Sequence, residues 1–379
     1  MYIITMCAPY AHPYSQGKRL LKLTQNPDGT AGTTTRIMGD CTYATPTYGT
    51  LAVNSPFGVW PYPIYGNLTV WDNGDKIYFE GYYNKKWKIV SGTVYSVGAV
   101  DGEATQFDEY PSSALNRVIV QHAFQQAGLS GRSIHLVTGL PVSAYYRHDG
   151  QRRQQEIDRK CESLKLSVEP KPNSAEPGKS ILSASVAFHE VIPEALAAWY
   201  DHVIITQADG VTLDGDRLSA PIAIVDIGGR TTDFVVVQDQ GIVHGSSGSL
   251  NRGMLNVKSR VADLIQQTFD MSELGEQSIA RAVDSSRLRL HGKDHDISAM
   301  VAAAKRELVE LLYAETRRKL GLGVELDQVL FVGGGSAALA TDIANWFPNQ
   351  TIPDHAAFAN ARGMLKYLQY VCDDTAGGF

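Results

Sequence analysis

The pattern of apolar and polar positions divides the chain into two parts. In the first third, short runs of alternating apolar and polar residues lie among many Tyr, Thr and Gly residues, which predicts strands and loops. The clearest run covers residues 68–80, where both arms flank Asn73 and Gly74, the sequence of a tight hairpin turn. Further along, helices are predicted over residues 116–127, 150–162 and 193–200, and strands over residues 133–138 and 181–188.

The chain changes character after residue 220. Residues 221–227 form a continuous apolar run, which is typical of a strand buried on both faces. Two earlier segments are predicted to be irregular: residues 169–179, with three prolines, and residues 209–220, a polar candidate linker. Later strands are predicted over residues 231–238 and 328–332, and helices over residues 254–269, 298–320, 337–346 and 357–371.

Composition and charge narrow the class of protein. The chain has 379 residues, enough for two or three domains. Its 34 Lys and Arg against 40 Asp and Glu leave a net charge of -6, which argues against direct binding of nucleic acid through bulk charge. No apolar run is long enough for a membrane span, so no membrane contact is expected. Four scattered cysteines and the lack of a secretory signal favour the cytoplasm.

The most informative segment is residues 224–237, where an apolar strand ends in Asp226 and a second strand returns after a short turn. Gly228 and Gly229 let the backbone approach a phosphate closely, and successive turn N–H groups can form an anion-binding nest. Thr231 and Thr232 add hydroxyl donors, and Asp226 is placed to hold a hydrated Mg²⁺. The alternative is a plain hairpin whose polar side chains satisfy the turn backbone.

A second glycine-rich turn follows the strand predicted over residues 328–332. Gly333, Gly334, Gly335 and Ser336 lead into a predicted helix, and such a strand–turn–helix can form a flat floor for a nucleotide. A dinucleotide-binding turn is the alternative, but the order of glycines and the position late in the chain argue against it.

In this order, the two turns resemble the phosphate and adenosine motifs of the actin-like ATPase superfamily, which includes actin and the sugar kinases. Within it, the chain is most similar to the ParM/StbA family of plasmid-segregation proteins. Three further segments carry this similarity, residues 138–146, 189–194 and 360–365. The resemblance implies an α/β actin-like ATPase fold, with two domains of mixed sheets flanked by helices around a nucleotide cleft. Domain I would cover residues 1–207, completed by a C-terminal helix within residues 351–379, and domain II residues 208–350.

The resemblance also implies roles for single residues. Glu190 would be catalytic and orient the attacking water, and Asp226 would be catalytic and bind the metal. Without the resemblance, Glu190 is equally well explained as a surface carboxylate that caps the helix start near Pro193. Gly228, Gly229, Thr231 and Thr232 would hold the phosphates, and Gly333, Gly334, Gly335 and Ser336 would line the adenosine pocket.

The implied function is nucleotide-driven polymerisation. ATP, or alternatively GTP, would bind with Mg²⁺, and closed subunits would join head to tail into a filament of the chain itself. The filament would segregate plasmid DNA through a DNA-bound partition adaptor protein.

The first residues differ from the family pattern. Thr5, Met6 and Cys7 stand where the family has an acidic residue and a glycine, and Pro9 and Pro13 offer no N–H to a phosphate. This favours, as an alternative, a nucleotide-binding scaffold that does not hydrolyse. A sugar kinase is a third class, but no obvious second catalytic Asp lies in a sugar-binding context. Two other segments are expected to be ordinary surface: the loop-like residues 173–180 and the polar loop from His291 to His295, which is not expected to bind a metal.

Overall fold

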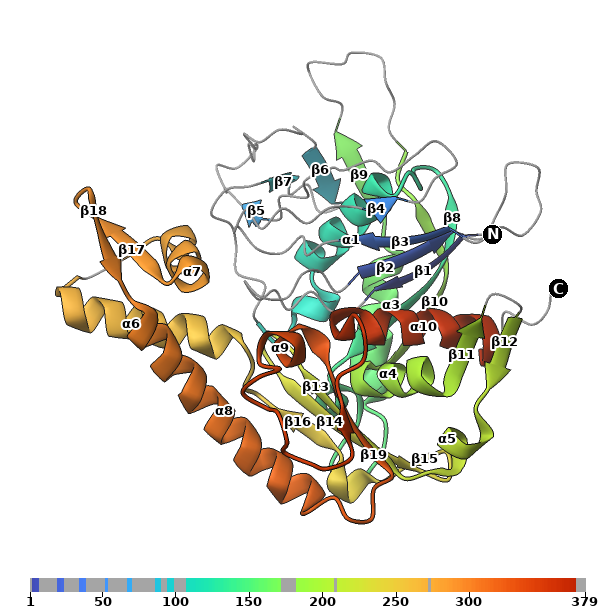
Figure 1. The fold of residues 1–379 in the computed structure, drawn as a ribbon. Coiled ribbons are helices and arrows are strands. Elements are labelled where there is room, and N and C mark those ends of the chain that lie inside the picture. The colour runs from blue at the N-terminus through green and yellow to red at the C-terminus, as the bar shows by residue number, and fades with distance from the viewer. Residues whose placement is uncertain are drawn as a thin grey trace.

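The computed structural model describes residues 107–171, 182–207, 210–271 and 274–372, together with short strands before residue 100 (Figure 1). The predicted turn at Asn73 and Gly74, the first loop after residue 6, and residues 173–180 lie outside this part.

The first of two large sheets is mixed. Three neighbouring strands run parallel, and three further strands continue the sheet antiparallel. Its order is β10 (Ser185–Pro193), β8 (Ser133–Leu140), β1 (Tyr2–Met6), β2 (Arg19–Leu23), β3 (Thr34–Met38) and β4 (Ala52–Val53). A smaller antiparallel sheet has the order β5 (Asn67–Thr69), β7 (Val94–Gly98), β6 (Lys86–Ile89) and β9 (Val168–Lys171).

The second large sheet is also mixed and belongs to the later half of the chain. Its central strand pairs antiparallel with the following strand and parallel with a strand that comes about one hundred residues later, so a long crossover separates the parallel pair. The order is β15 (Gly241–Ile242), β14 (Thr232–Gln238), β13 (Ile222–Ile227), β19 (Gln328–Val332) and β20 (Gln350–Thr351), with β16 (Gly248–Leu250) also paired to β14.

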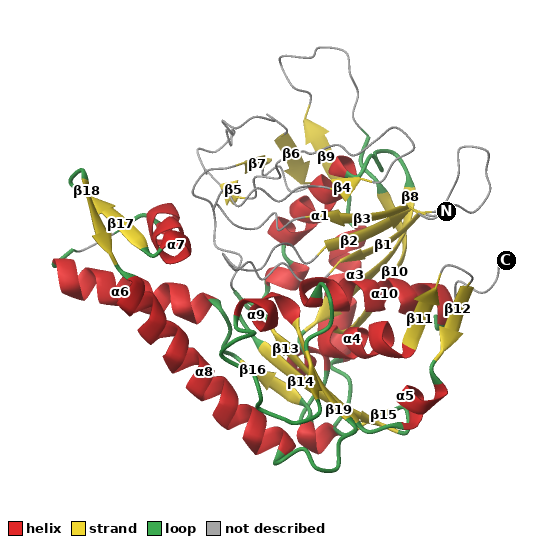
Figure 2. Cartoon of the chain, viewed as in Figure 1, coloured by secondary structure: helices red, strands yellow, loops and turns green. Residues whose placement is uncertain are grey.

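Helices cover both sheets and fill the space between them (Figures 1 and 2). The middle layer is α4 (Glu194–Val203) and α10 (Ala359–Tyr370), whose apolar side chains pack on both sheets. The outer face of the first sheet carries α1 (Ala114–Gln126) and α3 (Gln154–Lys165), and that of the second carries α6 (Leu255–Phe269) and α8 (Ser298–Leu320). The shorter elements are η1 (Tyr110–Ser112), α2 (Val142–Tyr145), β11 (Ile204–Gln207), β12 (Gly210–Leu213), α5 (Gly215–Ser219), η2 (His244–Ser246), α7 (Glu276–Ser285), β17 (Arg287–Leu290), β18 (Lys293–Asp296), α9 (Gly333–Ala338) and η3 (Ala356–Phe358).

The strand β13 explains why the apolar run at residues 221–227 has no polar face. Ile222 and Ile224 pack toward α4, whereas Ala223 and Val225 pack toward α6 and α8. Every residue of the strand is buried, so the prediction of a strand covered on both faces is confirmed. The predicted bounds of α8 and β19 are confirmed as well.

Three segments predicted to be irregular contain regular structure. Residues 169–179 begin inside β9, residues 209–220 contain β12 and α5, and the segment from His291 to His295 forms the turn and second arm of the β17–β18 hairpin. Each of these strands has an antiparallel partner, and pairing compensates for a weak local preference.

The helix predicted over residues 337–346 is wrong. The structure starts α9 at Gly333, directly after β19, and ends it at Ala338, with turns to follow. Glycine is a poor helix former, so sequence preference places the helix start too late. Close packing explains the exception, because a Cβ on Gly335 would lie 2.4 Å from Ile227 Cγ2.

The two helices of the middle layer cross at very short distance. A Cβ on Gly363 of α10 would lie 1.5 Å from the carbonyl oxygen of Ala197 in α4. Beside this crossing, Asp201 pairs with Arg362 Nε and Lys366 Nζ, each at 2.8 Å. The helices are therefore held by backbone contact and by a partly buried ion-pair group.

Replacing Gly363 with alanine should separate these helices. We expect Gly363→Ala to lower the free energy of unfolding by about 3 kcal/mol, because backbone atoms of α4 cannot move aside as a flexible side chain can. Urea unfolding followed by circular dichroism measures the change. The matched control is Gly215→Ala in α5, where a Cβ meets nothing within 4 Å, so its stability should stay equal or rise slightly. Equal stability of the two variants would contradict the close crossing.

Candidate functional site

The two glycine-rich turns lie at the same edge of the second sheet. β13 and β19 run parallel, with Asp226 opposite Val332, so the turns that follow them are neighbours. The approach is close: a Cβ on Gly333, which has φ of +85°, would lie 2.1 Å from Asp226 Oδ1. Only glycine fits here, since other residues would clash and rarely adopt this φ.

Asp226 lies in the interior of this edge, with 1% of its surface exposed. Its Oδ2 accepts a hydrogen bond of 2.6 Å from Asn360 Nδ2, at the start of α10. A carboxylate at the end of β13 thus connects α9 with α10. The sequence placed Asn360 in a family-like segment without giving it this role.

The turn after Asp226 is tight and is fixed to the start of α6. Gly228 N donates to Thr231 O at 2.9 Å. The carbonyl oxygens of Gly228 and Gly229 accept hydrogen bonds from Met254 N and Leu255 N, at 3.0 and 2.8 Å. These two hydrogen bonds satisfy backbone N–H groups at the start of α6 and fix the orientation of the turn relative to that helix.

The predicted hydroxyl ligands have protein partners in this structure. Thr231 Oγ1 donates to Asp233 Oδ2, and Thr232 Oγ1 donates to Arg252 O, both at 2.9 Å. Ser336 is buried in α9, where its Oγ donates to Val332 O at 2.5 Å. These bonds hold the two turns in shape, and ligand roles for the three hydroxyls stay predictions.

Glu190 belongs to the first sheet and is not part of this edge. It lies inside β10, opposite Val137 of β8, and is half-buried. The interpretation of Glu190 as a helix cap is wrong, because the strand continues to Pro193 and α4 begins only at Glu194. Burial raises the pKa of Tyr145 to about 12, and the nearby carboxylate of Glu190 adds to that rise.

The comparisons with known proteins agree with this geometry. Residues 84–203 match the family described as plasmid segregation protein ParM, N-terminal, and residues 224–345 match the archaeal actin homologue MreB-like C-terminal family. A non-polymerisable quadruple mutant of pCBH ParM is 17% identical, with a TM-score of 0.64, 97% of this chain and 99% of that chain covered. The archaeal actin homologue Ta0583 in complex with ADP is 16% identical, with a TM-score of 0.62 and the same coverage.

The chain has an actin-like fold. A ParM from a 15-stranded Clostridium botulinum filament is also similar, with 16% identity, a TM-score of 0.61, and 97% of this chain and 99% of that chain covered. The predicted resemblance to ParM/StbA is therefore confirmed. No curated protein matches the chain. Within the described residues, no helix is long and apolar enough to cross a membrane.

Sequence reasoning missed one buried carboxylate beside the glycine turns, Asp233. It lies in β14 directly opposite Asp226, and it is 1% exposed. Its Oδ1 accepts a hydrogen bond of 2.7 Å from Val142 N at the start of α2, and another from Ser249 Oγ. The bond to Val142 crosses from the second sheet to the segment after β8. A single Asp inside the apolar run of residues 232–237 was the available signal.

The residues at the edge fit a hydrated magnesium ion with phosphates. Mg²⁺ prefers oxygen ligands and commonly takes one or two carboxylates, with water and phosphate completing its shell. Asp226 supplies such a carboxylate, and Gly333 places no side chain against its Oδ1. No group of three or more His, Cys, Asp or Glu that could hold a metal occurs among the residues that the structure describes. An ion here would therefore depend on phosphate oxygens as well as protein.

The buried Asp233 makes stability depend on pH. Burial raises its pKa to about 6, from an ordinary value of 3.8, while Ser249 opposes the rise and Asp226 adds to it. The folded chain then holds the proton more tightly than the unfolded chain, so the free energy of unfolding should fall as the pH rises from about 4 to about 6. The expected loss is about 3 kcal/mol, at about 1.4 kcal/mol per pKa unit. Urea unfolding at a series of pH values measures it.

Asp233→Asn isolates this contribution. The amide keeps an oxygen for Val142 N and loses the titration, so the fall between pH 4 and 6 should be absent from the profile of the variant and should appear as the difference between wild type and variant. Asp239→Asn, at an exposed turn position just after β14, is the matched control and should keep the wild-type profile. If both variants follow the wild type, another group titrates.

Proposed function

We propose that the chain is an ATPase that forms filaments and segregates plasmid DNA. The observation that carries the proposal is the meeting of the Asp226 turn and the Gly333 turn at one edge of the second sheet. It is supported by the similarity to a ParM filament and to an ADP complex of an archaeal actin homologue. The nucleotide would be ATP or GTP, the chain would act in the cytoplasm, and the domain boundary would fall near residues 207 and 208.

The proposed roles follow from position and chemistry. The turn from Gly228 to Thr232 would bind the phosphates through backbone N–H groups and hydroxyls, and Gly333 to Ser336 would contact the adenosine. Asp226 would hold Mg²⁺ through water. The bound ion would neutralise charge on the phosphates. Glu190, from the first sheet, would orient the attacking water and accept its proton.

The link from Asp233 to Val142 suggests how the phosphate turn would communicate with the other domain. Asp233 accepts hydrogen bonds from Thr231 in the turn and from Val142 at the start of α2. A phosphate that binds Thr231 would change these two hydrogen bonds. The change would shift the equilibrium between an open and a closed arrangement of the two domains toward the closed one. Closed subunits would then join head to tail, and a DNA-bound adaptor would attach the plasmid to the filament.

Replacing Glu190 tests the proposal. We expect Glu190→Ala to lower the steady release of phosphate from Mg·ATP by about 100-fold or more, the usual contribution of a general base. Light scattering and electron microscopy with a non-hydrolysable ATP analogue should still detect filaments, because polymerisation needs binding and not cleavage. Glu162→Ala, at an exposed position of α3, is the matched control and should hydrolyse at the wild-type rate.

The outcomes separate two functions. Phosphate release by the wild type, lost in Glu190→Ala, supports the ATPase. Nucleotide-independent filaments without phosphate release would instead identify a scaffold. No filaments in either condition, at concentrations well above micromolar, would overturn the proposal.

A further inference from the structure

A hollow of about 300 Å³ lies where the segment after β8 meets the end of α8, and none of its lining residues belongs to the glycine turns. We call it the basic hollow, because its charged lining is basic throughout and includes no carboxylate. One wall comes from residues 142–153, and the other from residues 244–249 and the last turn of α8. Its basic side chains are Arg147, His148, Arg153, His244, Arg318 and Lys319.

Most of this positive charge has no acidic partner. Arg318 pairs with Glu315, one turn earlier in α8. Arg153 Nε donates to the carbonyl oxygens of Ser143 and Tyr146, at 2.9 and 3.3 Å, which leaves its charge uncompensated. Throughout the described ranges, no carboxylate lies within ion-pair distance of Arg147, Arg153 or Lys319. In a chain with a net charge of -6, such a cluster is a local exception.

Packing preforms the basic hollow. The His244 ring lies against the Tyr146 ring, with centroids 5.0 Å apart. Gly150, with φ of +79°, approaches His244 so closely that a Cβ there would lie 2.7 Å from the ring. The two walls are therefore in contact without any ligand.

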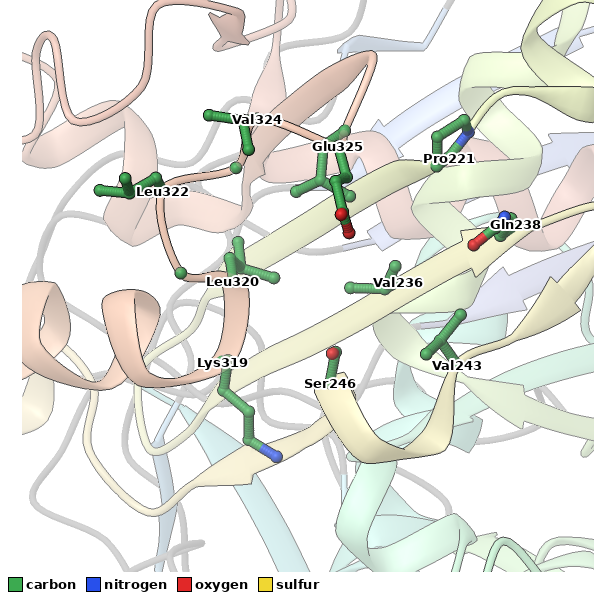
Figure 3. A pocket seen from close by; sticks show the side chains of 13 residues that line it. Pro221, Val236, Gln238, Val243, Ser246, Lys319, Leu320, Leu322, Val324 and Glu325 are labelled. Atoms are coloured by element: carbon green, nitrogen blue, oxygen red, sulfur yellow. The ribbon is translucent and has the colours of Figure 1, made fainter.

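Lys319 lies between the basic hollow and a neighbouring hollow, and it lines both. Figure 3 shows that neighbour, a hollow of about 310 Å³ beside the loop after α8, with Val236, Val243 and Leu320 on its wall. In this view the amino group of Lys319 points away from Val236 and Leu320. Its Nζ donates to Ser247 O at 2.6 Å, on the wall of the basic hollow. Burial and the charge of Arg318 lower the pKa of Lys319, while the carboxylate of Glu315 opposes the shift.

We propose that the basic hollow binds a small phosphate-bearing anion and that the anion bridges the two domains. Its donors come from three separate segments, so a compact anion with several oxygens can contact them together. The phosphate can be free, as inorganic phosphate or pyrophosphate, or can belong to a nucleotide. This site shares no residue with the glycine turns, and it does not depend on the proposed ATPase activity.

A titration of the full chain with pyrophosphate tests the proposal. Isothermal calorimetry at low salt should detect binding to protein that already carries one equivalent of Mg²⁺ and a non-hydrolysable ATP analogue. Arg147→Gln should weaken this binding about 5- to 10-fold, since it removes one charge-assisted contact, and Arg147→Gln with Lys319→Gln should weaken it further. Arg306→Gln, exposed on α8, is the matched control and should bind like the wild type. Pyrophosphate should also raise the thermal midpoint of the wild type more than that of Arg147→Gln.

The results of these titrations show whether the phosphate is free or belongs to a nucleotide, and they also show whether the proposed site is wrong. A parallel titration with ADP that depends on Arg147 identifies a nucleotide phosphate, and dependence for pyrophosphate alone identifies free phosphate. Equal pyrophosphate affinity of wild type and Arg147→Gln overturns the site. Loss of assembly in Arg147→Glu, without any pyrophosphate binding to the wild type, also overturns it and assigns the basic hollow to a carboxylate of another protein. If the chain binds no ATP analogue, the proposed ATPase function fails, but the pyrophosphate affinities of Arg147→Gln and Arg306→Gln still test the basic hollow.

Discussion

The parallel pairing of β13 with β19 is the constraint on which the site depends. It places the ends of two strands, distant in sequence, next to each other, and the chain must leave both ends without collision. Gly333 and Gly335 make this possible, because any Cβ there would strike Asp226 or Ile227. Packing alone therefore requires that these two positions carry no side chain. Backbone without side chains at the strand ends follows from it, and such backbone is what a phosphate group can approach closely.

Two aspartates face each other across the β13–β14 pair and connect the edge to the rest of the molecule. Asp226 is bonded to Asn360 of α10, and Asp233 to Val142 after β8. Both are buried, and burial of two neighbouring carboxylates is unfavourable unless hydrogen bonds compensate. Each has a donor from outside the second sheet, Asn360 for Asp226 and Val142 for Asp233. The shape of the site therefore depends on α10 and α2 as well as on the second sheet.

Local patterns predicted the elements whose burial is decided by their own residues. The apolar run of β13 and the stripe of α8 are visible without any knowledge of their neighbours, and both were located correctly. Elements that depend on distant partners were missed. The glycine helix α9 forms against Ile227, and β9 pairs with β6 from the first third of the chain. Asp233 escaped notice for the same reason, because its partner Val142 lies 91 residues away. The grouping of the two glycine turns could be inferred from resemblance, whereas the bonds that fix them could not.

The helix α8 joins two distant parts of the molecule as one rod. Its 23 residues span about 35 Å, at a rise of about 1.5 Å per residue. At its first residue, Ser298 N is bonded to Asp296 of the β17–β18 hairpin, and near its last turn Lys319 is bonded to Ser247. The pair of Arg260 and Glu307 fastens it to α6 midway. Over this length, a tilt of about 5° at one end displaces the other by about 3 Å. A rigid helix of this length would act as a lever, so a small rotation at the Ser247 contact would be enlarged at the β17–β18 hairpin.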